Sequence, residues 1–438
     1  MTVYNVWTER FSKARELLED SLGKVIVDHP IEENKELEKL PDGAAVAQLK
    51  ETLGGTMVIS PNVYMVANKM LSHFEEYAFE RYPEEQTFIT RAHSKDYMPR
   101  ALPVCQSGLA GVGKSQLCKF VSRLIVDNDR LIETSAGRFP VKGIQHIEDV
   151  NEKSAGRLVQ RFRPMPEVAA PRLDADRIYA AGRRLYTSGS AGVCLDELQF
   201  VSASGQASAK VTSLLLGVCQ TGVPWSFNCN YSLLTKLVAR NQEDIDRLLS
   251  NILLLEPEIV GSEASTAVVS SIMRAAKDVF PADDLDLCKK VSELTFGINR
   301  KISILLVLAY RSARSRGAHI VCDADIMAAY NSTQYSVHRS QVNALHETND
   351  WRLKNGFSDL ECPLDKEDIA LEEKKEHVKN TQYFLDRYLE QSLNKTESLN
   401  YFALKKESNQ KRLVSKETID IRSLSNRSEL EDAYNNIL

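Results

Sequence analysis

Residues 108–115 match the phosphate-binding pattern G-x-x-x-x-G-K-[ST]. In this pattern the glycines let successive backbone N–H groups turn toward phosphate oxygens. The lysine reaches the β- and γ-phosphates, and the serine hydroxyl can bind Mg²⁺. We therefore expect this loop and the residue after it to hold the phosphates of a nucleotide. The residues concerned are Gly108, Leu109, Ala110, Gly111, Val112, Gly113, Lys114, Ser115 and Gln116.

The two flanks of the loop have the context that the pattern requires. Residues 101–105 form a short apolar run typical of a strand. Apolar residues then recur with helical spacing between Leu117 and Ile125. A helix that begins at the loop adds the partial positive charge of its N-terminus to an anion site. Strand, glycine loop and helix together predict a nucleotide site.

A second candidate element is the apolar run 191–195, which ends in Asp196 and Glu197. An acid at the carboxyl end of a parallel strand beside a phosphate loop can hold Mg²⁺ through water, and the next residue can deprotonate the attacking water. We assign the first role to Asp196 and the second to Glu197, with Ser115 as the other metal ligand. The alternative is a helix N-cap followed by an acidic first turn.

Three further side chains are candidates for the same site. Asn230 follows the next strand-like run and can hydrogen-bond the γ-phosphate or the attacking water, although a plain turn asparagine fits equally well. Arg247, with Arg240 two turns earlier, precedes the last apolar strand and can reach the nucleotide of a neighbouring subunit. A surface ion pair is the commoner role of such an arginine. Arg300 begins a later helix and can cover the nucleotide.

The elements that position these residues divide the chain into four parts. Residues 1–98 are mainly helical, and 99–258 alternate strand-like runs with helices, which predicts a three-layer α/β domain with a parallel sheet. Residues 259–345 read as successive helices that form a lid. Residues 346–438 are polar, with a helix over 366–393 and a flexible tail. The strand-like runs are 101–106, 140–147, 191–196, 223–229 and 251–256.

Composition limits the class of protein. A hydrophobic content of 43% and a charged content of 26% are ordinary for a globular chain. The net charge of −5 argues against a generally basic nucleic-acid coat but leaves room for a local basic patch. No apolar run is long enough to span a bilayer, and no secretory signal is evident. The eight cysteines are scattered singly, which fits a reducing cytoplasm.

The order of these motifs resembles that of AAA+ ATPases. It comprises the phosphate loop, the Asp-Glu strand, Asn230, an arginine before the last strand, and Gly297-x-x-Arg300 in a helical lid. More narrowly, Asp196-Glu197-Leu198-Gln199-Phe200 resembles the D-E-[IL]-Q segment of the transposition ATPases TnsC and TniB. The run Gly222-Val223-Pro224, continuing to Cys229-Asn230-Tyr231-Ser232-Leu233, resembles the same family. The resemblance covers residues 90–345.

The resemblance implies an αβα AAA+ ATPase domain with a helical lid, which binds ATP and Mg²⁺. It implies a homo-oligomer, as a ring or filament on double-stranded DNA, that connects target-selection proteins to a transposase in the bacterial cytoplasm at the nucleoid. Lys114, Ser115, Asp196 and Glu197 take the family's catalytic roles, and Asn230 takes that of sensor 1. Either Arg247 or Arg240 is the arginine finger.

A basic segment lies between the second and third strand-like runs. Residues 153–184 contain eight lysines and arginines against three acids. Such a cluster can neutralise DNA phosphates without reading sequence, and the resembling ATPases have a DNA-facing insertion here. We predict DNA contacts for Lys153, Arg157, Arg161, Arg163, Arg183 and Arg184, with Arg172 and Arg177 as their neighbours. The alternative is a solvated helix face. A second group, Arg311, Arg314 and Arg316, ends a lid helix and is given no functional role.

Two other functions remain open at this point. One is a nucleotide-switched protein scaffold, in defence or signalling, that never touches DNA. The other is an AAA+ ATPase of DNA replication, such as an initiator or clamp loader.

Overall fold

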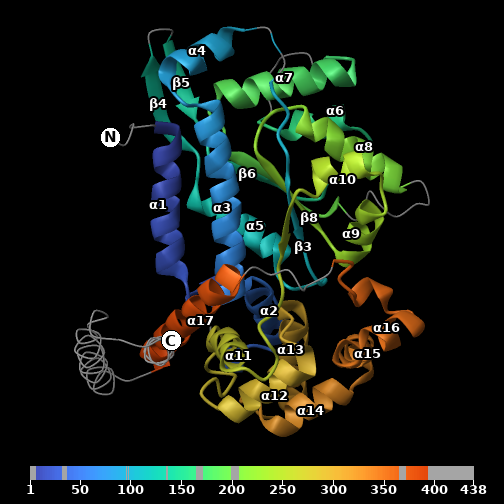
Figure 1. The fold of residues 1–438 in the computed structure, drawn as a ribbon. Coiled ribbons are helices and arrows are strands. Elements are labelled where there is room, and N and C mark those ends of the chain that lie inside the picture. Colours follow the sequence, from blue (N-terminus) through green and yellow to red (C-terminus); the bar gives the residue numbers. More distant parts are fainter. Residues whose placement is uncertain are drawn as a thin grey trace, which may run out of the picture. The chain divides into compact units, whose positions relative to one another are not determined.

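A computed structural model describes residues 6–31, 37–94, 96, 98–134, 137–163, 171–198, 207–364 and 371–392 of the chain (Figure 1). The chain divides into two compact units, Met1–Leu385 and Asp386–Leu438. The second unit is described only at residues 386–392, and the first contains every element discussed below except the last turns of α17. The predicted motif residues Gln199 and Phe200 and the predicted tail beyond residue 393 lie outside the described residues.

A parallel five-stranded sheet forms the centre of the first unit, in the order β6-β7-β8-β3-β9. Because β8 lies between β3 and β7, the carboxyl ends of these three strands meet at one edge, with Ser107 beside Cys229 and Leu195 beside Phe227. The predicted sheet is thereby confirmed. Its strands are β3 (Val104–Ser107), β6 (Ile144–Ile147), β7 (Gly192–Leu195), β8 (Trp225–Cys229) and β9 (Asn251–Leu254).

Helices cover both faces of this sheet and make the expected three layers (Figure 1). Successive strand residues face opposite cores: Val193 and Leu195 belong to one buried cluster and Cys194 to the other. The first cluster lies under α6 (Ala155–Leu158), α7 (Asp174–Thr187), α8 (Ala207–Cys219), α9 (Tyr231–Val238) and α10 (Gln242–Leu248). The second lies under α1 (Val6–Ser21), α3 (Pro61–Arg81) and α5 (Lys114–Leu124).

The N-terminal helices therefore form part of the α/β layers. Arg10 on α1 donates to the carbonyls of Lys142 and Gly189 at 2.7 and 2.8 Å, and burial lowers its pKa to about 10. The remaining N-terminal elements are β1 (Val25–Val27), η1 (Leu37–Lys39), α2 (Asp42–Gly54), β2 (Thr56–Val58) and α4 (Glu85–His93). β1 and β2 pair antiparallel.

One predicted strand run is divided in two. Residues 140–147 contain the end of β5 and the whole of β6, separated at Gly143. A Cβ at Gly143 would lie 2.0 Å from the carbonyl oxygen of Ile125, so the chain needs glycine to pass this point. β5 (Gly137–Val141) pairs antiparallel with β4 (Asn128–Thr134) in a hairpin outside the main sheet.

The helical region after β9 begins with α11 (Glu263–Arg274), α12 (Leu285–Thr295) and α13 (Asn299–Ser315). After Asn331 the helix α14 ends, and Ser332 caps a new turn. The elements that follow α13 are α14 (Asp323–Asn331), η4 (Thr333–Tyr335), α15 (Ser336–His346), α16 (Asn349–Lys354), η5 (Ser358–Leu360) and α17 (Leu371–Ser392). Among the described residues, no helix combines the length and the apolar character that a membrane span requires.

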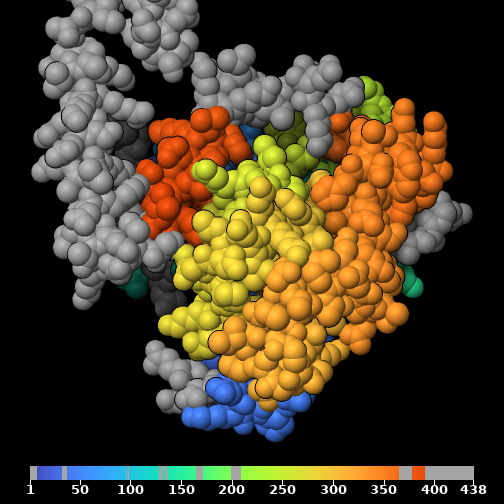
Figure 2. All heavy atoms as spheres, turned by 90° about the horizontal axis from the view of Figure 1, so that it is seen from below, coloured from blue at the N-terminus to red at the C-terminus, as the bar shows by residue number. Residues whose placement is uncertain are grey.

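Helix α2 packs against this helical region, far from its neighbours in sequence. Arg314 near the end of α13 donates to Asp42 at 2.7 Å and to the carbonyls of Leu40 and Glu38 at 2.9 and 3.1 Å. Figure 2 shows the blue N-terminal segment against the yellow and orange helices on this face. Arg314 thus joins the N-terminal region to the lid, and Arg316 pairs with Asp325 within the lid.

Candidate nucleotide site

The phosphate loop connects β3 to α5, as the pattern predicted. A Cβ at Gly108 would lie 2.2 Å from the Leu255 carbonyl oxygen, which explains why glycine begins the loop. Lys114 Nζ donates to the carbonyls of Gly108 and Leu109 at 2.8 and 2.9 Å, so the lysine spans the loop from inside. Burial lowers the pKa of Lys114 to about 8, and Asp196 opposes that effect. The lysine is therefore held at the centre of an enclosed loop.

Asp196 lies at the carboxyl end of β7, next to Ser115 at the start of α5. Burial acts to raise the pKa of Asp196, but the neighbouring His146, Ser115 and Asn228 side chains outweigh it and lower the pKa to about 2. Asn228 Nδ2 donates to Asp196 Oδ1 at 2.9 Å, and His146 Nε2 lies 3.8 Å from Oδ2. A hydroxyl and an ionised carboxylate are oxygen ligands of the kind that Mg²⁺ takes together with phosphates and water. These two groups fit the predicted metal.

Sequence reasoning missed Asn228 and His146. A signal was present in each case: a polar residue within an apolar strand run, where a buried polar group needs a partner. Asn228 lies on β8 and His146 on β6, the two strands that flank β7. Both therefore reach the end of β7 from its neighbouring strands.

Glu197 is positioned by an unusual backbone conformation. It has φ 60°, in the left-handed region, and its N–H donates to Asp196 Oδ1 at 2.8 Å. Asp149, which follows β6, also has a positive φ of 52°. Burial, together with the neighbouring carboxylates Asp149 and Asp196, raises the pKa of Glu197. An acid whose pKa is raised accepts a proton more readily, which suits a general base.

Asn230 caps a helix and also lines the pocket. It caps α9, because its side-chain oxygen accepts from the Leu233 N–H at 3.0 Å and from Ser232 Oγ at 2.9 Å. It also lines the pocket beside the phosphate loop, as does Asn228. The cap fixes the place of Asn230 at the pocket, and contact with a γ-phosphate stays a prediction.

Helix α13 begins directly over the phosphate loop. The Arg300 N–H donates to the Gly111 carbonyl at 3.0 Å, and Asn299 Nδ2 donates to the Val112 carbonyl at 3.3 Å. A Cβ at Gly111 would lie 2.7 Å from the Cβ of Arg300, so this glycine also serves the contact with the lid. The Arg300 side chain lines the pocket, and its cover of a nucleotide stays a prediction.

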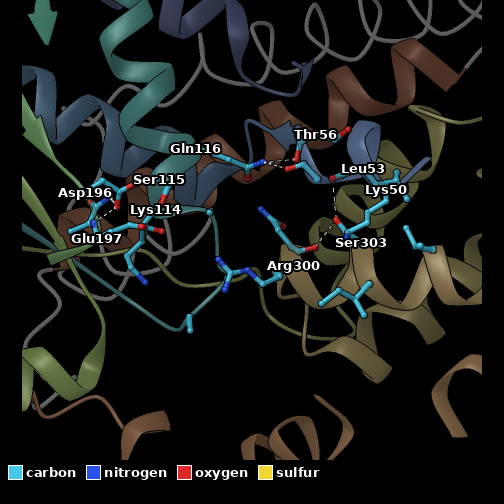
Figure 3. A pocket seen from close by; sticks show the side chains of 18 of the residues that line it. Lys50, Leu53, Thr56, Lys114, Ser115, Gln116, Asp196, Glu197, Arg300 and Ser303 are labelled. Carbon is cyan, nitrogen blue, oxygen red and sulfur yellow. Dashed lines mark hydrogen bonds between the residues drawn. The ribbon is translucent and has the colours of Figure 1, made fainter. Parts of the chain in front are cut away.

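The pocket has a volume of about 620 Å³ and extends well beyond the phosphate loop. In Figure 3, Lys114, Ser115, Asp196 and Glu197 lie at one end, which we call the phosphate end. At the other, the base end, residues of the α2–β2 segment face residues of α13. The base end was not predicted, and its residues are Lys50, Leu53, Gly54 and Thr56 with Ser303, Ile304, Val307, Leu308 and Arg311.

Hydrogen bonds hold the base end together from two sides. Ser303 Oγ donates to the Leu53 carbonyl at 3.0 Å, and Gln116 Nε2 donates to the carbonyls of Gly54 and Thr56 at 3.0 and 3.2 Å. Gln116 therefore connects the phosphate loop to the base end in addition to any contact with phosphate. The missed signal was the spacing of Arg300, Ile304, Val307, Leu308 and Arg311, which places them on one face of α13.

Neither candidate finger lines the pocket of its own chain. Arg247 pairs with Glu243 at 2.5 Å, and Arg240 pairs with Asp244 at 2.9 Å. Each ion pair is partly exposed and joins two residues one helical turn apart. Action on a neighbouring subunit stays a prediction for each.

Many of the guanidinium groups in the basic segment bind within the chain. Arg161 donates to the carbonyl of Glu148, Arg163 to Asp127, Arg183 to the carbonyl of Arg91, and Arg184 to the carbonyl of Phe162, at 2.6 to 2.8 Å. Arg177 donates to the Pro171 carbonyl at 2.7 Å. Lys153, Arg157 and Arg172 are exposed. The DNA contacts stay a prediction, and these three cations are the better placed for them.

The chain matches no protein-family model and no curated protein. It is similar to several solved structures. The ORC2 protein of Aeropyrum pernix (ADPNP–ADP complexes) is 16% identical over 60% of this chain and 67% of that chain, with a TM-score of 0.41. The ORC1 protein of Aeropyrum pernix in complex with DNA is 13% identical over 74% and 82%, with a TM-score of 0.38.

A third similar structure is the RuvB Holliday junction branch migration motor of Thermotoga maritima. It is 10% identical over 58% of this chain and 67% of that chain, with a TM-score of 0.31. The resemblance to AAA+ ATPases, and the narrower one to TnsC and TniB, both stay predictions from the sequence motifs. At these identities and TM-scores, the likeness assigns no function to the chain.

Proposed function

We propose that this chain is a Mg²⁺-dependent ATPase of the AAA+ type. The supporting observation is that the phosphate loop, the Asp196–Glu197 pair, Asn230 and Arg300 border one pocket although they come from distant parts of the sequence. Lys114 and Mg²⁺ on Ser115 and Asp196 offset the charge that develops on the phosphates. Glu197 accepts the proton of the attacking water, and Arg247 or Arg240 of a neighbouring subunit completes the site.

We further propose that ATP binding drives assembly of the chain as a ring or filament on double-stranded DNA, and that hydrolysis dismantles it. The support is the resemblance of Asp196-Glu197-Leu198-Gln199-Phe200 and of the run after Gly222 to the TnsC and TniB transposition ATPases. In this role the assembly links target-selection proteins to a transposase. The cations proposed to face DNA are Lys153 and Arg157, together with Arg172.

The experiment is electron microscopy of the full chain with duplex DNA and either ATP, a non-hydrolysable analogue or ADP. Assembly is expected with ATP and the analogue and not with ADP. Lys114→Ala should prevent assembly because the phosphates lose their main cation, whereas Glu197→Gln should trap it because the water is no longer deprotonated. Normal assembly and disassembly by both variants would contradict the switch, although nucleotide binding itself could persist.

The internal contacts of the basic segment favour one alternative, a nucleotide-switched protein scaffold. Arg161, Arg163, Arg183 and Arg184 hold loops and helix ends of their own chain, so the local excess of positive charge serves packing as well. The two functions differ in salt-dependent affinity for duplex DNA. Lys153→Glu with Arg157→Glu should remove that affinity if the chain binds DNA here. Absent affinity in the unaltered chain would favour the scaffold.

A further inference from the structure

Residues 355–364, which we call the return segment, leave the lid after α16 and pack back onto the α/β domain. Within them, η5 lies against α9. Leu360, Cys362 and Leu364 pack against the buried cluster that contains Tyr231 of α9 and Ile298, just before α13. The chain between β9 and α11 already connects the two parts. The return segment therefore joins the lid to the α/β domain a second time.

Arg352 on α16 fixes the return segment to the lid. Its Nε and Nη2 donate to one oxygen of Glu361 at 3.0 and 2.8 Å, and its Nη1 donates to the Glu347 carbonyl at 2.8 Å. The two side chains are only 12% and 20% exposed. Charge-assisted bonds with little solvent around them hold geometry better than an exposed ion pair does.

Two residues within electrostatic range of the return segment, Tyr231 and Lys301, directly follow candidate site residues. Tyr231 follows Asn230 and is 3% exposed, and burial, with Glu256 and Cys362 nearby, raises its pKa. Lys301 follows Arg300 and is 5% exposed, and its Nζ donates to Gln341 at 3.1 Å. Burial lowers the pKa of Lys301 to about 8, while Asp359 of the return segment opposes the effect.

We propose that the return segment is a positioning element that sets the place of Asn230 on α9 relative to Arg300 on α13 across the nucleotide pocket. Nucleotide that contacts both residues then tightens the segment, and a loosened segment weakens both contacts. This inference rests on the proposed nucleotide site. Its agents, Arg352 and Glu361, do not line the pocket and act only through Tyr231 and Lys301.

Two native cysteines allow a direct measurement on the full chain. Cys362 in the return segment is partly exposed and Cys322 on the lid is exposed, whereas the remaining six are buried. The rate at which iodoacetamide labels each thiol is read by peptide mass spectrometry, with and without Mg²⁺ and a non-hydrolysable ATP analogue. We expect the analogue to slow labelling of Cys362 about tenfold, as local opening becomes rarer, and to leave Cys322 unchanged.

Arg352→Ala is the variant that tests the mechanism, with Lys354→Ala on the same helix as the matched control. Arg352→Ala should speed Cys362 labelling, abolish the effect of the analogue on it and raise the KM for ATP more than it lowers kcat. Glu361→Gln, which keeps the shape of the side chain, should give a smaller change of the same kind. Thermal unfolding confirms that each variant is folded.

The outcomes separate this inference from the proposed function. If the unaltered chain binds the analogue but Cys362 labels at the same rate with and without it, the positioning role is wrong. The same conclusion follows if the folded Arg352→Ala and Glu361→Gln variants both behave like Lys354→Ala. If the unaltered chain binds no nucleotide at all, the proposed ATPase function itself is wrong.

Discussion

The two ends of the pocket differ in how they are built. At the phosphate end, charged and polar groups come from the loop after β3 and the ends of β7 and β8, so one edge of one sheet supplies them all. At the base end, Leu53 and Thr56 meet Ile304 and Leu308 across a boundary between the N-terminal region and the lid. The phosphate end is a property of the α/β domain, whereas the base end exists only when the N-terminal region and the lid pack together.

This difference indicates what each end contributes to binding. In the proposed function, the phosphate end holds a charged ligand through Lys114, the loop N–H groups and a metal. The base end offers apolar side chains whose stabilisation follows from the area they remove from water. The affinity for a ligand that has phosphates but no base should therefore depend only on the phosphate end. Tripolyphosphate is such a ligand, and it makes the comparison measurable.

The largest expected effect concerns the phosphate end. Lys114→Ala should weaken the binding of ATP and the binding of tripolyphosphate alike, by about 100-fold. Each ligand loses a charge-assisted contact in an enclosed loop. Isothermal titration calorimetry in the presence of Mg²⁺ measures both. Lys119→Ala, five residues along the same helix, is the matched control and should bind normally. A loss confined to ATP would contradict the division of the pocket.

The next effect is on stability and depends on pH. The pKa of Asp196 in the folded chain, about 2, lies below its ordinary value of 3.8, so its hydrogen bonds stabilise the fold above pH 4 and that stabilisation is lost as the pH falls through 2. Asp196→Asn should cost on the order of 2 kcal/mol at pH 7 and progressively less below pH 4. Ile304→Ala at the base end should show no such dependence. Urea unfolding at several pH values tests both.

A smaller effect is expected at the base end itself. Ile304→Ala and Leu308→Ala should each weaken the binding of ATP by about tenfold through lost apolar contact. The affinity for tripolyphosphate should stay unchanged. The same calorimetry applies, with Val337→Ala on the exposed surface of α15 as control. Equal losses for both ligands would mean that these side chains shape the phosphate end instead.

The smallest effect comes from one hydrogen bond across the boundary. Ser303→Ala removes the donor to the Leu53 carbonyl, which costs about 1 kcal/mol and should raise the KM for ATP roughly threefold. Steady-state kinetics would show kcat nearly unchanged. A larger fall in kcat than in affinity would place Ser303 in the chemistry and blur the distinction between the two ends.

The same distinction explains what could be predicted from sequence. An apolar run in the sequence predicts each strand of the sheet. Lys114, Asp196 and Glu197 are predicted from local motifs whose chemistry needs fixed spacing. The base end has no such pattern, because Leu53 and Ile304 are ordinary apolar residues until tertiary packing brings them together. Asn228 is an intermediate case. Its polarity within a buried strand was visible in the sequence, but its pairing with Asp196 was not.

The basic segment shows the reverse difficulty. Its charge was evident, yet charge alone does not reveal where a guanidinium group points. Arg183 donates to the Arg91 carbonyl at the end of α4, and Arg184 donates to the Phe162 carbonyl. No local sequence spacing predicts either contact. Counting cations therefore overstated the number that face solvent.

The contact between Ser303 and Leu53 joins residues 250 positions apart in the chain. During synthesis the α2 segment emerges early, and the face of α13 that covers it follows only after the whole sheet has been made. At roughly 5–20 residues per second, that interval is on the order of 10–50 s. Through it, the nascent chain can possess a complete phosphate loop before the α13 side of the pocket has been synthesised. Nucleotide captured that early would be held by its phosphates alone.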